Sequence, residues 1–158
     1  MKHSLENRRR QCLQLVVTPE HFNSLPNFNQ AQENLDVLRD SLAIFGRVLH
    51  RHGLSNDVGL ALLHRHFDLA SDEILIETVI PSKSESIGSP RVVEGSSKVL
   101  PHLFRAVFDP SLGDYVWYPT EFVDAQHDDG TLAARYAKFV AHAALLKDMA
   151  DVLQAEGD

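Results

Sequence analysis

The sequence predicts an α+β fold, in which an antiparallel sheet of about four strands is flanked by an N-terminal helix and a long C-terminal helix. Three observations lead to this prediction. Apolar residues recur at helical spacing near both ends of the chain, extended apolar runs occupy its middle, and turn-forming residues separate these runs. With 158 residues, of which 44% are hydrophobic and 23% charged, the chain is expected to form one domain over 1–158.

The first long helix is expected from about Gln30 to His52. Its apolar residues fall within about a third of the helical circumference: Leu35, Leu38, Leu42, Phe45 and Leu49. Gly53 supplies the left-handed residue through which helices commonly end. Before it, Thr18–Phe22 has the pattern of a short helical turn, with Pro19 near its start. A flexible basic tail is expected over residues 1–12.

Two hairpins are expected in the middle of the chain. The first joins a strand over Val58–Phe67 to a strand over Glu73–Ile80, which is rich in β-branched residues. The second joins Leu103–Phe108 to Tyr115–Tyr118 across a turn that contains Pro and Gly. Residues 81–97, rich in Ser, Gly, Pro and charge, are expected to form a long surface loop that is mobile or closes over a site as a lid.

The last element is expected to be a helix from about Thr131 to Ala155. One stripe of apolar and aromatic residues runs along it: Leu132, Tyr136, Phe139, Ala143, Leu146, Ala150 and Leu153. Asp128, Asp129 or the hydroxyl of Thr131 could cap its first turn. The order of helix, four strands and helix favours a sheet covered by helices on one face.

Composition excludes several classes of protein. The formal net charge of −7 argues against a general nucleic-acid-binding surface, which needs clustered Lys and Arg. Cys12 is the single cysteine, so an internal disulfide and a four-thiolate zinc site are excluded and a reducing cytoplasm fits. No apolar run has the length of a signal segment or a membrane span. We therefore expect a soluble, cytoplasmic protein with no nucleic-acid or membrane partner.

The most informative stretch of the chain contains His64 and His66. On a strand these two imidazoles point to the same face as Leu60 and Leu62, because side chains alternate along a strand. Such a face suits the wall of a pocket with apolar residues at its bottom and polar chemistry near its mouth. Trp117, from a later aromatic-rich stretch, could line the same pocket.

Two histidines on one face can also bind a metal ion, because neutral imidazole is a common ligand of zinc, iron, copper and nickel. His64 and His66 would supply two ligands. His102, at the start of the third expected strand, is the preferred third ligand, and Glu77 or Glu73 are the alternatives. The simpler interpretation is that these histidines are hydrogen-bonded structural residues.

A resemblance to a protein family appears at the same residues. Segments 59–69 and 73–77 resemble small fungal proteins that share a Leu-His-x-His-Phe core followed by an acidic and apolar strand. Segment 117–122 is similar to the Pro-Tyr-Glu-Phe stretch of those proteins, whereas Leu103-Phe104-Arg105 stands where they tend to have Trp-Arg-Phe. The resemblance implies no activity and no further catalytic residue.

These observations lead to two functional hypotheses. In the first, the protein is a small enzyme in which His64 and His66, with His102 as a third member, hold zinc or iron or perform acid–base chemistry on a small organic substrate. In the second, it is a non-catalytic ligand-binding domain, or a homodimeric interaction domain, whose histidines are structural. The sequence contains no Gly-x-Ser-x-Gly elbow and no Gly-rich phosphate loop.

Overall fold

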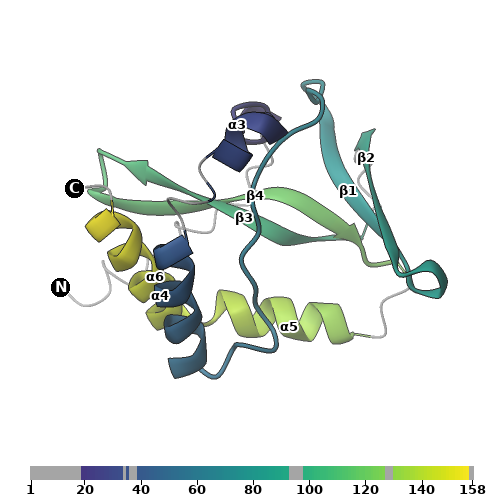
Figure 1. Ribbon diagram of the computed structural model, residues 1–158. Coiled ribbons are helices and arrows are strands. Elements are labelled where there is room, and N and C mark those ends of the chain that lie inside the picture. Colours follow the sequence, from purple (N-terminus) through teal and green to yellow (C-terminus); the bar gives the residue numbers. More distant parts are fainter. Residues whose placement is uncertain (1–18, 34, 36–38, 93–97, 127–129, 157–158) are drawn as a thin grey trace.

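The computed structural model describes residues 19–33, 35, 39–92, 98–126 and 130–156. At its centre lies a four-stranded sheet, with helices beside it (Figure 1). The strand order is β2-β1-β4-β3, and the strands are β1 (Glu73–Ile80), β2 (Glu85–Val92), β3 (Val99–Asp109) and β4 (Asp114–Asp124). The predicted α+β class is confirmed. The expected basic tail over residues 1–12 lies outside the described residues.

The sheet is mixed, so the prediction of a fully antiparallel sheet is wrong. β1 and β2 form one antiparallel hairpin, β3 and β4 form another, and the hairpins join through a parallel pairing of β1 with β4. In that pairing Leu75 lies beside Glu121, and Glu77 beside Val123. β4 suits the inner position because it has buried apolar residues on both faces, as strands in the interior of a sheet usually do.

Between residues 19 and 51, the described part of the chain forms the short helices α2 (Pro19–Asn23) and α3 (Phe28–Glu33) and the longer helix α4 (Arg39–Arg51). The helical turn expected at Pro19 is confirmed. The expected helix over 30–52 is only partly correct, because its first turns belong to α3 and its main part is α4; residues 34 and 36–38 are outside the described residues. The predicted stop at Gly53 is confirmed by its left-handed φ of 68°.

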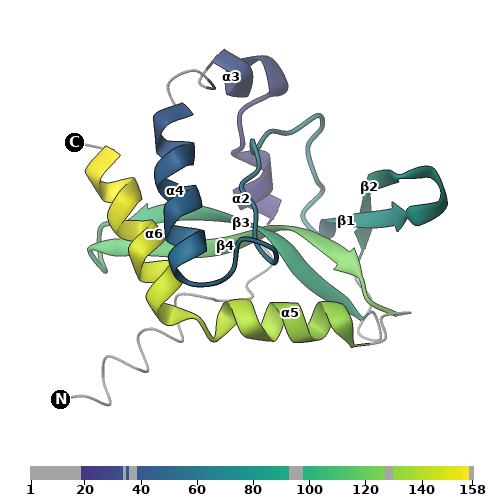
Figure 2. The same ribbon diagram turned by 60° about the horizontal axis from the view of Figure 1, so that its bottom comes forward.

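The C-terminal region forms two helices, α5 (Thr131–Val140) and α6 (Ala143–Glu156), where one over 131–155 was expected. The break has a packing reason, because α5 packs against β3 whereas α6 packs against α4 (Figure 2). One straight helix could not direct its apolar stripe to both partners. The N-cap of α5 is Gly130, with φ 98°, and the predicted caps Asp128 and Asp129 lie outside the described residues.

The first expected hairpin is wrong. Residues 58–64 have no regular secondary structure, and the strand over 73–80 pairs with β2 instead of with them. Residues 81–97, expected as a loop, contain a short 3-10 helix, η1 (Pro81–Lys83), and the whole of β2. β2 has a polar sequence because its side chains are almost all exposed, and Pro90 is tolerated because β2 is an edge strand.

The second expected hairpin is confirmed. β3 and β4 pair from Val99 with Asp124 to Asp109 with Asp114, and the turn passes through Gly113. Both strands are longer than the apolar runs that predicted them. The extension carries β4 alongside β1 and brings His102 into the body of β3.

The segment that was expected as the first strand crosses the molecule from the end of α4 toward β1 (Figure 1). Its far end is fixed by polar contacts with the α2–α3 region. The backbone amide of Arg65 donates to the carbonyl of Pro26 over 2.9 Å, and the Arg65 Nε donates to the carbonyl of Leu25 over 2.8 Å. The side-chain amide of Asn23 exchanges two hydrogen bonds with the backbone of Leu69. These contacts replace the backbone hydrogen bonds that a strand would have made with a neighbouring strand.

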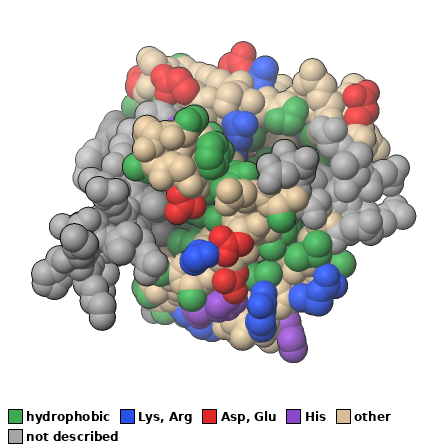
Figure 3. Space-filling view, turned by 90° about the vertical axis from the view of Figure 1, so that its left-hand side faces the viewer, with side chains coloured by type: hydrophobic (Ala, Val, Ile, Leu, Met, Phe, Trp, Pro, Cys, Tyr) green, Lys and Arg blue, Asp and Glu red, His purple; other side chains and the backbone are tan. Residues whose placement is uncertain are grey.

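The largest buried apolar cluster joins α4, α6 and β4. Its buried members are Phe45, Val48, Leu49, Leu54, Trp117, Leu145, Leu146 and Met149. On the side of the molecule where α4 and α6 lie, Figure 3 shows acidic and basic side chains interspersed, with no broad area of one sign among the coloured atoms. No described helix is long and apolar enough to cross a membrane.

Candidate functional site

Three ionisable side chains from three neighbouring strands meet on the sheet. They are Glu77 of β1, Glu121 of β4 and His102 of β3. One ligand atom from each lies within 4.8 Å of the others, and among the described residues this is the one group of three His, Cys, Asp or Glu side chains with such spacing. We call these residues the His–Glu triad.

The strand pairing explains why these side chains share a face. Leu75 and Glu121 are partners in the parallel ladder, so Glu77, two residues along β1 from Leu75, points to the same side as Glu121. The β3–β4 ladder is irregular between Pro101 and Phe104, and His102 lies within this irregular stretch. Local irregularities of this kind often redirect a side chain next to a functional site.

The distances within the triad are short. His102 Nε2 lies 2.9 Å from Glu77 Oε2 and 3.9 Å from Glu121 Oε2. Ligand atoms bound to zinc at 2.0–2.2 Å are themselves about 2.8–3.6 Å apart in tetrahedral or octahedral geometry. The distance between His102 and Glu77 lies within that range and the distance between His102 and Glu121 lies above it, so a small movement of Glu121 would complete a three-ligand set.

Burial and charge disfavour ionisation of Glu121. Its side chain is 23% exposed and that of Glu77 22% exposed. Desolvation is the largest effect and raises the pKa of Glu121, and the neighbouring Glu77 carboxylate adds to the rise, whereas His102 and His64 oppose it. A carboxyl group held in this way accepts a nearby cation readily, because the cation relieves the repulsion between the two glutamates.

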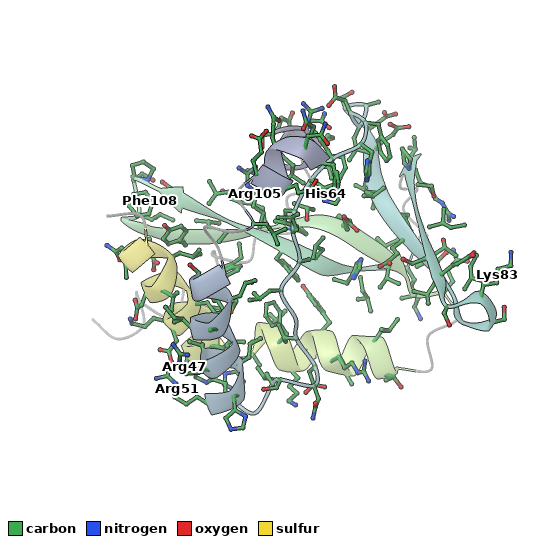
Figure 4. All side chains as sticks on the ribbon, viewed as in Figure 1. Arg47, Arg51, His64, Lys83, Arg105 and Phe108 are labelled. Atoms are coloured by element: carbon green, nitrogen blue, oxygen red, sulfur yellow. The ribbon has the colours of Figure 1, made fainter. Side chains whose placement is uncertain are left out.

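The predicted pair His64 and His66 also comes together, although not on a strand. The two Nε2 atoms lie 3.1 Å apart. His64 Nδ1 donates to the carbonyl of Leu62 over 2.9 Å, since a carbonyl oxygen can only accept. In the neutral pair, His64 Nε2 therefore accepts a hydrogen from His66 Nε2. Figure 4 shows His64 on the segment that passes below α3, where the ring of Phe28 lies against both imidazoles.

The structure does not bring His102 into one cluster with His64 and His66. His102 instead joins Glu77, which was an alternative third ligand, while His64 acts on Glu121 only as a nearby charge. The other alternative, Glu73, has a local role, because its carboxylate accepts a hydrogen bond from the backbone amide of Ala70 over 2.8 Å.

Glu121 was missed from the sequence, although a signal was present. It lies two residues before Val123 and four after Trp117, at the alternate positions of an apolar strand. An ionisable residue at such a position is expensive to bury, so it is a candidate for function. Glu121 can be assigned to the site only with the strand order, which places β4 between the strands of Glu77 and His102.

A cavity of about 310 Å³ lies next to the triad. Its walls are residues 57–61 and 63, β3 and α5, and His102 belongs to its lining. Of the residues predicted to line a pocket, Leu60 and Trp117 do so and Leu62 does not. His64 and His66 do not line this cavity either. This cavity therefore shares Leu60 and Trp117 with the predicted pocket, but the histidine that borders it is His102.

Comparisons with known proteins give no relative from which a function could be transferred: no protein-family model, no curated protein and no solved structure matches the chain.

Proposed function

We propose that this protein is a small metal-dependent enzyme whose centre is the His–Glu triad and whose substrate is a small organic molecule. The observation that carries the proposal is the meeting of Glu77, His102 and Glu121 within 4.8 Å on three adjacent strands, at the edge of a cavity. Strands hold side chains more rigidly than loops do, and this rigidity is what a metal site requires.

The ligand types favour a divalent transition metal. One imidazole and two carboxylates suit zinc, iron or manganese, and three protein ligands leave positions for water and substrate, as in catalytic metal sites. A bound divalent ion supplies Lewis-acid activation and lowers the pKa of its water ligand. The protein's own contribution is to hold two carboxylates close together, which the ion would stabilise and which is costly without it.

His102 connects the metal centre with the substrate cavity. Its Nε2 faces Glu77, while the residue forms part of the cavity wall. A substrate in the cavity would therefore lie beside the metal. The predicted catalytic residues His64 and His66 are close enough to act on Glu121 electrostatically through His64, and we assign them a supporting acid–base role.

A second candidate needs no metal. Glu77 orients His102 through a 2.9 Å contact, and Glu121 is a carboxyl group of raised pKa. His102 could therefore act as general base and Glu121 as general acid. A carboxyl group whose pKa is raised by burial is better suited to act as a general acid. The same residues serve both candidates, and metal binding distinguishes between them.

The experiment is calorimetric titration of the untagged, chelator-treated protein with zinc. We expect one ion per chain. His102→Ala and Glu121→Gln should each weaken binding at least tenfold, as loss of one ligand or its orientation commonly does. His50→Ala is the matched control, because His50 is an exposed histidine on α4 outside the triad.

Circular dichroism must show that the variants remain folded. If zinc binding survives in both triad variants but disappears in the double variant His64→Ala with His66→Ala, the histidine pair is the metal site and the proposal is wrong. If the folded wild-type protein binds no zinc, iron or manganese, metal dependence is excluded and the acid–base candidate replaces it.

A further inference from the structure

The lining of the cavity beside the triad is mostly apolar and includes four ionisable residues, Asp57, His102, Arg135 and Tyr136. Its apolar lining comes from all the elements around it, and representative residues are Leu60, Leu63, Leu100, Phe104, Leu132 and Phe139. Its volume of about 310 Å³ is at the lower end of the range for ligand pockets. At about 30 Å³ per water-sized group, it accommodates about ten non-hydrogen atoms.

Two of these ionisable residues belong to α5. Arg135 and Tyr136 are consecutive residues of this helix, and both line the cavity. Arg135 is exposed, and no described carboxylate forms an ion pair with it within 4 Å. Tyr136 is half-buried, and desolvation raises the pKa of its hydroxyl, which keeps the hydroxyl protonated as a donor. Asp57 and Arg135 interact only as nearby charges, so this guanidinium, with the phenol hydroxyl of the next residue, is a suitable receptor for a carboxylate.

The other charged residues around the cavity favour Arg135 as the site for an anionic ligand group. Asp57 is an acidic residue of the lining, and its carboxylate already contacts Lys138 Nζ at 2.5 Å. His102 also lines the cavity and is held by Glu77, and in the metal-free protein the two glutamates of the triad would repel an anion. In the metal-free protein a carboxylate in the cavity is therefore attracted to Arg135 and disfavoured near the triad.

We infer that the cavity binds a small amphipathic carboxylate, with its acid group on Arg135 and Tyr136 and its apolar body against the Leu and Phe side chains. The inference names the substrate class of the proposed function and rests on it for the chemistry, but binding itself can be tested without metal. The orientation presents the apolar body, not the carboxylate, to His102. The bond that reacts would then be remote from the acid group.

The probes are octanoate, which has about the right size, and octylamine, which has the same chain with the opposite charge. Binding to the metal-free protein is measured by calorimetry. We expect octanoate to bind at least about tenfold more tightly than octylamine, because a hydrogen bond to a charged group contributes about 1.5–3 kcal/mol. In Arg135→Gln this preference should fall about tenfold, while octanol, which carries no charge, binds unchanged.

Two further variants complete the test. Lys147→Gln removes the same charge from the exposed face of α6, outside the cavity, and should change nothing. Leu60→Trp should weaken binding of all three probes, because it fills the cavity, and it should fold normally because Leu60 is 41% exposed. Equal binding of octanoate and octylamine, or an unchanged preference in folded Arg135→Gln, would overturn the inference.

The outcomes separate this inference from the proposed function. Octanoate binding without any metal binding would support the ligand class and remove the metal-dependent enzyme. Metal binding without a preference for octanoate would leave the metal centre and exclude the carboxylate. Neither result depends on activity of the metal-loaded protein.

Discussion

Arg65 provides the strongest test of how the segment after α4 is held. If residues 58–67 formed a strand, the Arg65 side chain would point away from the apolar face, and its removal would change stability by less than about 0.5 kcal/mol. In the structure the Nε of Arg65 donates to the Leu25 carbonyl at 2.8 Å, and the guanidinium also contacts Asp68. Arg65→Ala should therefore destabilise the protein measurably.

The magnitude follows from these two contacts. The hydrogen bond to the carbonyl involves a charged donor that is 33% exposed, so its loss costs about 1.5–2 kcal/mol, toward the lower end of the range for such bonds. The ion pair adds at most about 1 kcal/mol, because Asp68 is 67% exposed. A total of about 2 kcal/mol corresponds to a fall in Tm of about 4–8 °C for a chain of this length.

Urea denaturation followed by circular dichroism measures this cost, and Asp68→Ala is the matched control. Asp68→Ala removes the ion pair and leaves the hydrogen bond to Leu25, so it should cost at most about 1 kcal/mol. If Arg65→Ala costs less than about 0.5 kcal/mol, or no more than Asp68→Ala, the hydrogen bond does not hold the segment and the structural explanation is refuted.

Two other predictions concern the core and the triad. Leu145 is fully buried between α4, α6 and β4, so Leu145→Ala should destabilise by about 2.7–5 kcal/mol in urea denaturation. Leu112→Ala, at a residue that is 51% exposed, should change stability by less than about 0.5 kcal/mol, and similar costs for both would contradict the packing of α6. Glu121→Gln should gain stability relative to the wild type as pH rises above 4.5, because a pKa raised in the folded state makes the wild type lose stability through that window. Denaturation at pH 4 and pH 7 measures this change. If the stability of Glu121→Gln relative to the wild type falls as pH rises, the desolvation of Glu121 is contradicted.

Local patterns predicted the elements whose neighbours lie close in the chain. The stop at Gly53 and the β3–β4 hairpin follow from short-range turn chemistry, and the structure contains both. β2 was missed although its partner β1 directly precedes it in the chain. β2 has few buried side chains, so its pairing with β1 is made by the backbone and leaves little trace in the sequence. The alternation at Leu60 and Leu62 resembled a strand, but β4 and β2 occupy both positions beside β1.

Dependence on a pairing between strands that are distant in the chain also limits prediction of the site. His102 and Glu77 could be named as candidates because each is a ligand type on an expected strand, and the structure places their atoms 2.9 Å apart. Glu121 could not be joined to them, because its place between them depends on the parallel pairing of β1 with β4. A sheet with sequential antiparallel order would have placed β2 beside β3 and separated β1 from β4. The crossover that makes the sheet mixed is thus also what assembles the triad, so a disturbance of the β1–β4 pairing should affect stability and metal affinity together.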